Sequence, residues 1–104
     1  MVSTLAERQS EVADLCERFG VRRLEVFGSA ASEEKFDPQK SDVDFIVEFH
    51  RDRDLGPWLE KYFALRDALS ELVGYPVDLV MSSAMKNPYF IREANRTRRL
   101  LYGA

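Results

Sequence analysis

The sequence predicts an α/β fold in which helices pack on a short mixed β-sheet. Two longer segments carry apolar residues at the spacing of an amphipathic helix, and three shorter segments show the alternation of a half-buried strand. The predicted order is helix, strand, strand, helix, strand, helix, which is typical of layered α/β architectures. A chain of 104 residues is long enough for one domain, residues 1–104, built around a single core.

The N-terminal part predicts a helix over residues 4–19 and a strand over residues 23–27. In the helix, apolar residues recur at helical spacing, and Gly20 supplies a stop. These apolar residues are Leu5, Val12, Leu15, Cys16 and Phe19. The strand, "RLEVF", alternates its side chains between two faces until Gly28 breaks the run.

A second strand is predicted over residues 42–49, "DVDFIVEF". Successive side chains of a strand point to opposite faces, so this strand separates into an apolar face and a mixed face. The apolar face carries Val43, Phe45, Val47 and Phe49, and the mixed face carries Asp42, Asp44, Ile46 and Glu48. Both aspartates are therefore expected to point the same way.

The C-terminal half predicts two helices and a strand between them. Helical periodicity marks residues 57–73, which end before Gly74. The segment "PVDLVM" predicts a strand over residues 76–81, with Asp78 on one of its faces. A final helix is predicted over residues 88–99, from a proline through the arginine-rich tail.

Composition limits the functions that we expect. The net charge of −3 gives no strong nucleic-acid signature, and no apolar run approaches the roughly 20 residues of a membrane span. The first residues lack the features of a secretory signal, so we expect a cytoplasmic protein without a membrane segment. The single cysteine, Cys16, excludes an intrachain disulfide and a cysteine metal cluster, and we expect it to be a small buried hydrophobe.

Asp42 and Asp44 are unusual in a strand that is otherwise apolar. Burying an unpaired carboxylate is costly, so the face that carries them must meet water, have basic partners or hold a cation. Aspartates at positions i and i+2 lie about 6 to 7 Å apart at the backbone, which allows both side chains to converge on one site. Oxygen ligands without a nearby histidine or cysteine favour Mg²⁺ or Mn²⁺ over zinc. For the pair alone, a solvated face is the alternative.

Gly28 and Ser29 add a second component. Gly28 ends a strand and lets the backbone turn closely, and Ser29 offers a hydroxyl beside free backbone N–H groups. This arrangement suits a phosphate, although a turn with a helix cap is the alternative when the pair is taken alone. Asp78, on a third strand, is placed to complete the carboxylate cluster. The combination predicts a metal ion that bridges a triphosphate.

These motifs resemble those of the minimal nucleotidyltransferases of the DNA polymerase β superfamily, particularly the antitoxin partners of HEPN-type toxins. The matching segments are "VFGSA", "SDVDFIVEF", "PVDLV" and the tail "KNPYFIREANRTRRLLYGA". The resemblance covers nearly the whole chain from about residue 20. It implies a minimal nucleotidyltransferase fold, with a short mixed sheet of three or more strands flanked by about four helices.

The resemblance also implies a mechanism, nucleotidyl transfer with two Mg²⁺ ions and ATP as the donor. Asp42 and Asp44 would ligate the metals that bridge the nucleotide phosphates, and Asp78 would ligate the metal near the attacking hydroxyl. Gly28 and Ser29 would hold the β- and γ-phosphates. The acceptor implied is a tyrosine hydroxyl of a partner HEPN toxin, for which this chain would act as the antitoxin.

The sequence departs from the family pattern next to the Gly-Ser pair. A spacer of twelve residues, "AASEEKFDPQKS", separates Ser29 from Asp42, and it lacks the arginine that often follows the pair. Lys35 or Lys40 is a candidate source of that charge, or else a solvated loop lysine. The arginine-bearing tail is a candidate docking surface, or else a solvated helix end. The lone histidine, His50, is expected to be a surface residue.

Two other functions fit the same motifs. The chain is alternatively a binding module that neutralises a toxin by contact alone. A third alternative is a transferase for small molecules, although the short length of the chain speaks against it. Because the chain has no second domain to close the site, we expect part of the binding surface to come from a partner or a second copy, which leaves a homo-oligomer possible.

Overall fold

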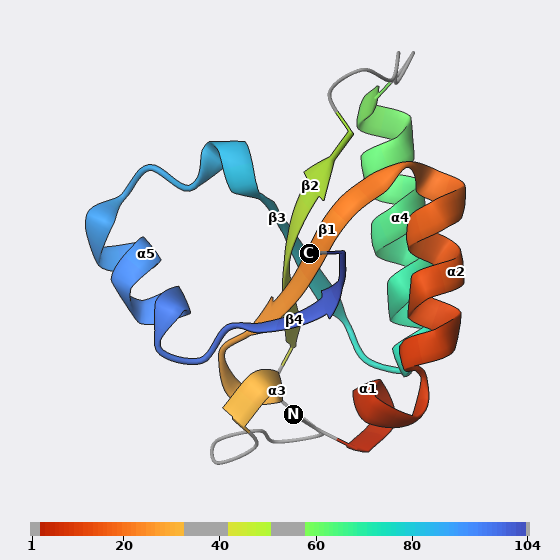
Figure 1. The fold of residues 1–104 in the computed structure, drawn as a ribbon, viewed down its shortest axis with the longest axis horizontal. Coiled ribbons are helices and arrows are strands. Elements are labelled where there is room, and N and C mark those ends of the chain that lie inside the picture. The colour runs from red at the N-terminus through yellow and green to blue at the C-terminus, as the bar shows by residue number, and fades with distance from the viewer. Residues whose placement is uncertain (1–2, 33–41, 51–57, 104) are drawn as a thin grey trace.

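The protein is a four-stranded mixed β-sheet with helices on both faces, an α/β fold as predicted (Figure 1). The structure is a computed structural model that describes residues 3–32, 42–50 and 58–103. The helices are α1 (Ser3–Glu7), α2 (Gln9–Phe19), α3 (Ser29–Ser32), α4 (Trp58–Val73), the 3₁₀ turn η1 (Ser82–Ala84) and α5 (Pro88–Asn95). The strands are β1 (Val21–Phe27), β2 (Val43–Phe49), β3 (Val77–Met81) and β4 (Arg99–Tyr102).

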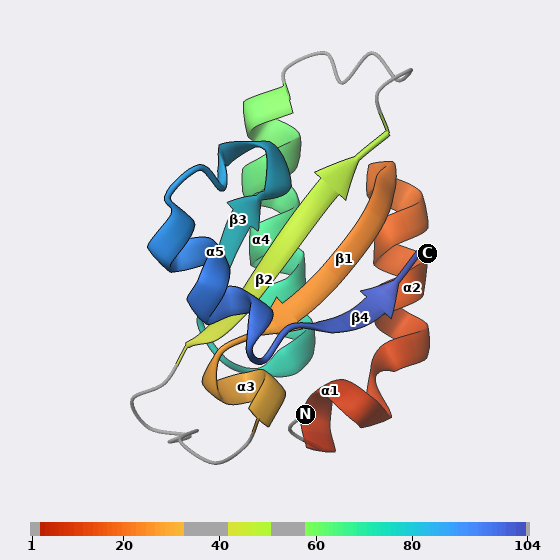
Figure 2. The same ribbon diagram turned by 60° about the vertical axis from the view of Figure 1, so that its left-hand side comes forward.

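The strand order β3-β2-β1-β4 places the predicted acidic strands side by side (Figure 2). β1 pairs antiparallel with both β2 and β4, whereas β2 and β3 are parallel. A parallel pair needs a crossover, and α4 supplies it by running back over one face of the sheet. The register pairs Asp44 directly with Asp78.

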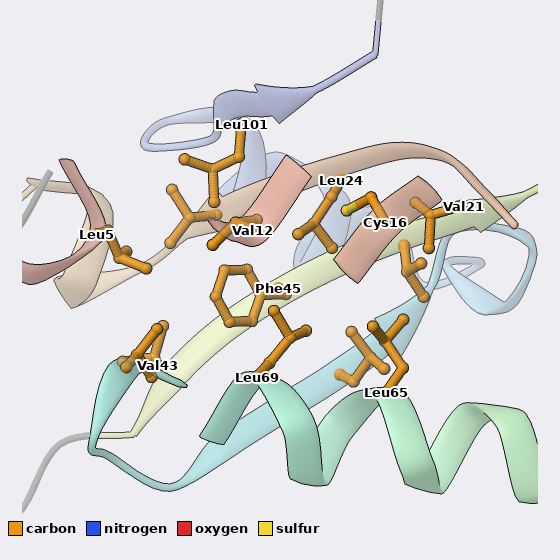
Figure 3. Packing of buried hydrophobic residues seen from close by; sticks show 14 of the residues in the cluster. Leu5, Val12, Cys16, Val21, Leu24, Val43, Phe45, Leu65, Leu69 and Leu101 are labelled. Carbon is orange, nitrogen blue, oxygen red and sulfur yellow. The ribbon is translucent and has the colours of Figure 1, made fainter. Parts of the chain in front are cut away.

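The main core lies between the sheet and the helices α2 and α4 (Figure 3). The apolar face of β2 is buried, as the alternation predicts: Val43, Phe45 and Val47 are fully buried. Leu65 and Leu69 from α4 and Val12 and Cys16 from α2 close over them. Cys16 is therefore a core residue, and burial raises the pKa of its thiol to about 12, which keeps the thiol protonated at neutral pH.

The opposite face of the sheet is covered only in part within the described residues. There α5 packs a small second cluster against β1 and β2, formed by Phe27, Ile46 and Ala94. Phe27 and Phe90 meet edge to face, with ring centroids 5.7 Å apart. The mixed face of β2 is thus apolar beneath α5 and acidic beyond it.

Two predicted helices differ from the structure. The N-terminal helix, predicted over residues 4–19, is interrupted at Arg8, where the backbone leaves the helical region. The C-terminal helix, predicted over residues 88–99, ends at Asn95, and residues 99–102 form strand β4. The free edge of β1 offers backbone hydrogen bonds to these last residues, so pairing with a distant strand replaces continued helix. Among the described helices, none is long and apolar enough to cross a membrane.

Candidate functional site

The three predicted aspartates lie at one end of the parallel pair formed by β2 and β3. Asp44 and Asp78 face each other in the register of the two strands, so their side chains leave the same face of the sheet. Asp42 immediately precedes β2 rather than forming its first residue, and its side chain is exposed. Asp78 is also exposed, whereas Asp44 is half-buried.

Asp44 is electrostatically unfavourable in its ionised form. Burial, followed by the charges of Asp78 and Asp42, raises the pKa of the Asp44 carboxyl to about 6. Within the described part of the chain, neither a hydrogen bond nor an ion pair reaches this carboxylate, and no cation lowers its pKa. Such a cluster is a candidate site for a positively charged ligand.

The Gly28 turn lies directly against Asp44. Gly28 has a φ of +74°, and a Cβ at this position would come within 3.0 Å of Asp44 Oδ2. Both the left-handed backbone and the close approach therefore require glycine. The carbonyl of Gly28 accepts hydrogen bonds from the backbone N–H groups of Ala31 and Ser32, which winds the short helix α3 directly after the turn. The predicted phosphate-binding pair and the predicted carboxylates are therefore neighbours.

Thr97 is a contributor to this region that sequence reasoning missed. Its Oγ1 accepts a hydrogen bond of 2.7 Å from the backbone N–H of Gly28, across 69 positions of the chain. The hydroxyl therefore holds the turn from the side of the segment between α5 and β4. No local motif marks this threonine, because the contact depends on where that segment crosses the sheet.

Arg98 anchors the same segment through an ion pair. Its guanidinium donates from Nε and Nη2 to the two carboxylate oxygens of Glu25, at 2.8 and 2.6 Å. Among the described residues, Glu25 is the one charged residue that is buried. Its hydrogen bond with Arg98 lowers the pKa of its carboxyl. Arg23 adds a further contact of 3.3 Å from its Nε. This part of the tail is therefore fixed to β1 and is not a solvated helix end.

An open groove of about 520 Å³ adjoins the Gly-Ser turn, within the size range of small-molecule sites. Its lining residues come from the end of β1, α3, α5 and the turn that follows α5: Phe27, Gly28, Ser29, Ser32, Phe90, Glu93, Ala94, Arg96 and Thr97. A depression of about 630 Å³ between α2 and α4 is larger, but surface residues without a catalytic motif line it. The groove beside Gly28 is favoured not by its volume but because Gly28, one of its lining residues, lies next to Asp44.

The donor set suits a hard divalent cation, although the side chains are not gathered around one. Carboxylate oxygens are the ligands that Mg²⁺ prefers. A bound cation would also relieve the repulsion between Asp44 and its neighbours Asp78 and Asp42. Across residues 3–32, 42–50 and 58–103, however, no three His, Cys, Asp or Glu side chains stand ready to hold a metal ion. The aspartates therefore fit a cation because their oxygens are suitable ligands and because the strand register brings Asp44 and Asp78 together.

The remaining sequence candidates are placed differently. Lys35 and Lys40 lie outside the described residues. His50 is half-buried, and its backbone N–H donates to the Gly20 carbonyl at the end of β2. Tyr62 of α4 donates its hydroxyl to the Leu79 carbonyl, beside Asp78, so it ties α4 to the acidic strand.

Comparisons with known proteins identify a family and relatives of the chain. A family model described as nucleotidyltransferase domain matches residues 12–101. The chain is 44% identical over 75 residues to a proposed protein adenylyltransferase of Methanocaldococcus jannaschii, covering 72% of this chain and 70% of that protein. It is 43% identical over 74 residues to the protein adenylyltransferase MntA of Thermococcus cleftensis, covering 71% and 69%.

Solved structures give the same picture of the fold. The structure of a proposed minimal nucleotidyltransferase is similar at a TM-score of 0.70 and 33% identity, covering 92% of this chain and 91% of that one. A tri-AMPylated Shewanella oneidensis HEPN toxin in complex with its MNT antitoxin gives a TM-score of 0.64 at 17% identity, covering 96% and 73%. At that identity the second likeness concerns the fold alone.

Proposed function

The chain belongs to the nucleotidyltransferase domain family, and on this premise we propose that it transfers AMP from ATP to a tyrosine hydroxyl of a partner HEPN toxin. In this role the protein is the antitoxin of the pair. Protein adenylyltransferases are the relatives that the chain matches over about seven-tenths of its length.

One observation carries the proposal, namely the contact between Gly28 and Asp44. The turn expected to hold phosphates and the carboxylate expected to hold a cation come together in space, although the spacer separates them in the sequence. Asp78 joins Asp44 through the strand register. A triphosphate bound by the turn therefore lies beside the carboxylate pair, which is the arrangement that nucleotidyl transfer needs.

In the proposed reaction, the tyrosine oxygen attacks the α-phosphorus of ATP. A new P–O bond forms, the bond from the α-phosphorus to the oxygen bridging to the β-phosphorus breaks, and pyrophosphate leaves with that electron pair. Asp78 receives the tyrosine proton, because it is exposed on the edge strand β3, where a side chain of another protein can reach it. Gly28 and Ser29 hold the β- and γ-phosphates.

We assign the metal ligands to Asp42, Asp44 and Asp78. Two Mg²⁺ ions held there would supply Lewis-acid stabilisation of the charge on the reacting phosphates. Asp44, the half-buried member, fixes its carboxylate against the Gly28 turn, whereas Asp42 and Asp78 are exposed. Burial is the main cause of the raised pKa of Asp44, and repulsion from Asp78 and Asp42, which a cation would relieve, raises this pKa in the same direction.

The partner is proposed from the openness of the site and from the fold relatives. The carboxylate end of the sheet is exposed at Asp42 and Asp78, so a protein surface has room to approach it. Neighbours in fold include a toxin–antitoxin structure with AMP-PNP, at a TM-score of 0.67 and 17% identity. We also propose that the protein works in the cytoplasm, where the donor ATP is available.

The proposal is tested by incubating the purified chain with its candidate toxin, ATP and Mg²⁺ and measuring the intact mass of the toxin. We expect the toxin to gain one AMP unit or a short run of them, and a toxin Tyr→Phe variant to stay unmodified. The Asp78→Asn variant is expected to abolish transfer while it largely keeps ATP binding, because Asp78 serves the acceptor side.

One observation favours a second candidate, a non-catalytic module that inhibits the toxin by contact alone. In the described chain, the carboxylates are not preassembled as a group of three metal ligands. A toxin that stays unmodified, yet is inhibited when the chain is added at equal concentration, would establish this alternative.

A further inference from the structure

The groove beside the Gly-Ser turn has an uneven distribution of charge. Among the described residues that line it, Arg96 is the cation and Glu93 is the anion. Their side chains form a loose pair, with 3.7 Å between Arg96 Nη1 and Glu93 Oε2, and they are 72% and 46% exposed. An exposed pair of this length contributes little to stability, so Arg96 is free to exchange Glu93 for a stronger anion.

The position of Arg96 is fixed by its neighbours in the sequence. Thr97, the next residue, accepts the hydrogen bond from Gly28, and Arg98 is held by Glu25. The two anchors hold the backbone of Arg96 against the turn, while the Arg96 side chain remains exposed. An exposed guanidinium on an anchored backbone is suited to a phosphate, since it offers several donors in one plane.

The order of groups along the site suggests which phosphate Arg96 contacts. Gly28 lies close to Asp44, since a Cβ at this position would come within 3.0 Å of Asp44 Oδ2, and Gly28 also lines the groove. The reacting phosphate must lie at the carboxylates, so phosphates that continue past Gly28 enter the groove. The last of them, the γ-phosphate, is then the one nearest Arg96.

We propose that Arg96 is a specificity-determining residue that binds the γ-phosphate of the donor, so that the protein selects nucleoside triphosphates over diphosphates. This inference rests on the proposed function, because it takes the position of the reacting phosphate from it. Glu93 acts in the opposite direction, since its carboxylate competes with the nucleotide for Arg96.

The test compares the binding of ATP and ADP, each with Mg²⁺, by calorimetry. In the Arg96→Gln variant we expect the Kd for ATP to rise about five- to tenfold, while the Kd for ADP changes less than twofold. The difference in ATP affinity between the wild type and the Arg96→Gln variant is expected to shrink in high salt, because the Arg96 side chain is exposed. The Glu93→Gln variant is expected to bind ATP more tightly. Arg92→Gln is the matched control, since Arg92 is an exposed arginine of α5 that does not line the groove.

The outcomes separate this inference from the function on which it rests. If the wild-type chain binds ATP and adds AMP to a toxin while Arg96→Gln binds ATP as tightly as the wild type, the role of Arg96 is wrong and the function stands. Equal weakening of ATP and ADP binding would instead place the base or ribose in the groove and overturn the inference. A wild-type chain that binds no nucleotide overturns both.

Discussion

Two carboxylates on the same face of the sheet have opposite surroundings. Glu25 of β1 is 5% exposed, accepts two hydrogen bonds from Arg98 and has a lowered pKa. Asp44 of β2 is half-buried, lies beside Asp78 and Asp42, and has a pKa raised to about 6. Of these two carboxylates, only Glu25 has its charge compensated by a residue of the described chain. The comparison indicates that a satisfied carboxylate holds the fold together, whereas an uncompensated one marks the place for a ligand.

The largest effect is expected when Asp44 is changed to Asn. This substitution keeps the shape of the side chain but removes a charge beside the reacting phosphate, so transfer is expected to fall on the order of a hundredfold or more. The thermal stability of the metal-free protein at neutral pH is expected to hold or rise, because repulsion is relieved. Mass spectrometry of the toxin and a melting curve measure the two effects.

Glu48→Gln is the matched control for this substitution. Glu48 lies on the same strand and the same face, but its carboxylate pairs with Arg22 at 3.0 Å near the surface. We expect near wild-type transfer in that variant. Normal transfer by the Asp44→Asn variant would show that the site is misassigned.

For Glu25→Gln we expect the reverse of the Asp44→Asn pattern, namely a loss of stability. Removing the charge leaves Arg98 without its carboxylate partner, which is expected to lower the free energy of unfolding by about 2 kcal/mol. The exposed pair of Glu11 and Arg8, 2.9 Å apart, provides a control, and Glu11→Gln is expected to cost less than about 0.5 kcal/mol. Chemical denaturation measures both. Equal losses in the two variants would mean that burial of Glu25 does not matter.

Sequence periodicity was sufficient to predict the strands that carry the acidic residues. The alternation in "DVDFIVEF" gave the face of Asp44 correctly, because one side of β2 is buried in the main core. It did not give the pairing of Asp44 with Asp78, which depends on a parallel register between distant segments. The position of Asp42 outside β2 was also missed, since strand ends are set by pairing rather than by pattern.

The tail was the poorest part of the prediction, for a physical reason. Its arginines resemble the last turn of a helix, yet Arg98 serves an ion pair 73 positions away and Arg99 begins β4. Thr97 contacts Gly28 across a similar separation. Contacts of this kind have no local signature, so the residues that position the site were less predictable than the carboxylates within it.

A smaller effect distinguishes the Gly28 turn from an ordinary glycine turn. Gly28 and Gly74 have similar backbone angles, with φ of +74° and +79°, but only a Cβ at Gly28 would meet Asp44, while nothing lies within 4 Å at Gly74. Alanine at either position is expected to cost about 1 kcal/mol of folding free energy. Only Gly28→Ala is expected to lower transfer as well, by about tenfold. Equal activity in the two variants would remove the role of this contact.

The smallest expected effects are the opposite pH dependences of the two carboxylates in the metal-free protein. The pKa of Glu25 is lower in the folded state than its ordinary value of 4.5, so its contribution is present above that pH and is lost as the pH falls through the folded pKa. The pKa of Asp44 is raised from 3.8 to about 6, so its ionisation costs stability as the pH rises through this window.

Denaturation in EDTA across this pH range compares each variant with the wild type. The stabilising effect of Asp44→Asn is expected to grow as the pH rises toward 7, and the destabilising effect of Glu25→Gln is expected to fade as the pH drops below about 4. If both substitutions changed the stability in the same direction across this pH range, the contrast between the paired and the uncompensated carboxylate would be contradicted.

The central claim is that the uncompensated carboxylates beside Gly28 bind a nucleotide through a divalent cation. A calorimetric titration of the wild-type chain with ATP, once with Mg²⁺ and once with EDTA, tests it most directly. The account predicts measurable ATP binding with Mg²⁺ and a loss of at least about tenfold in affinity with EDTA, because the carboxylates and the phosphates then repel one another. Equal ATP affinity under the two conditions would contradict the account.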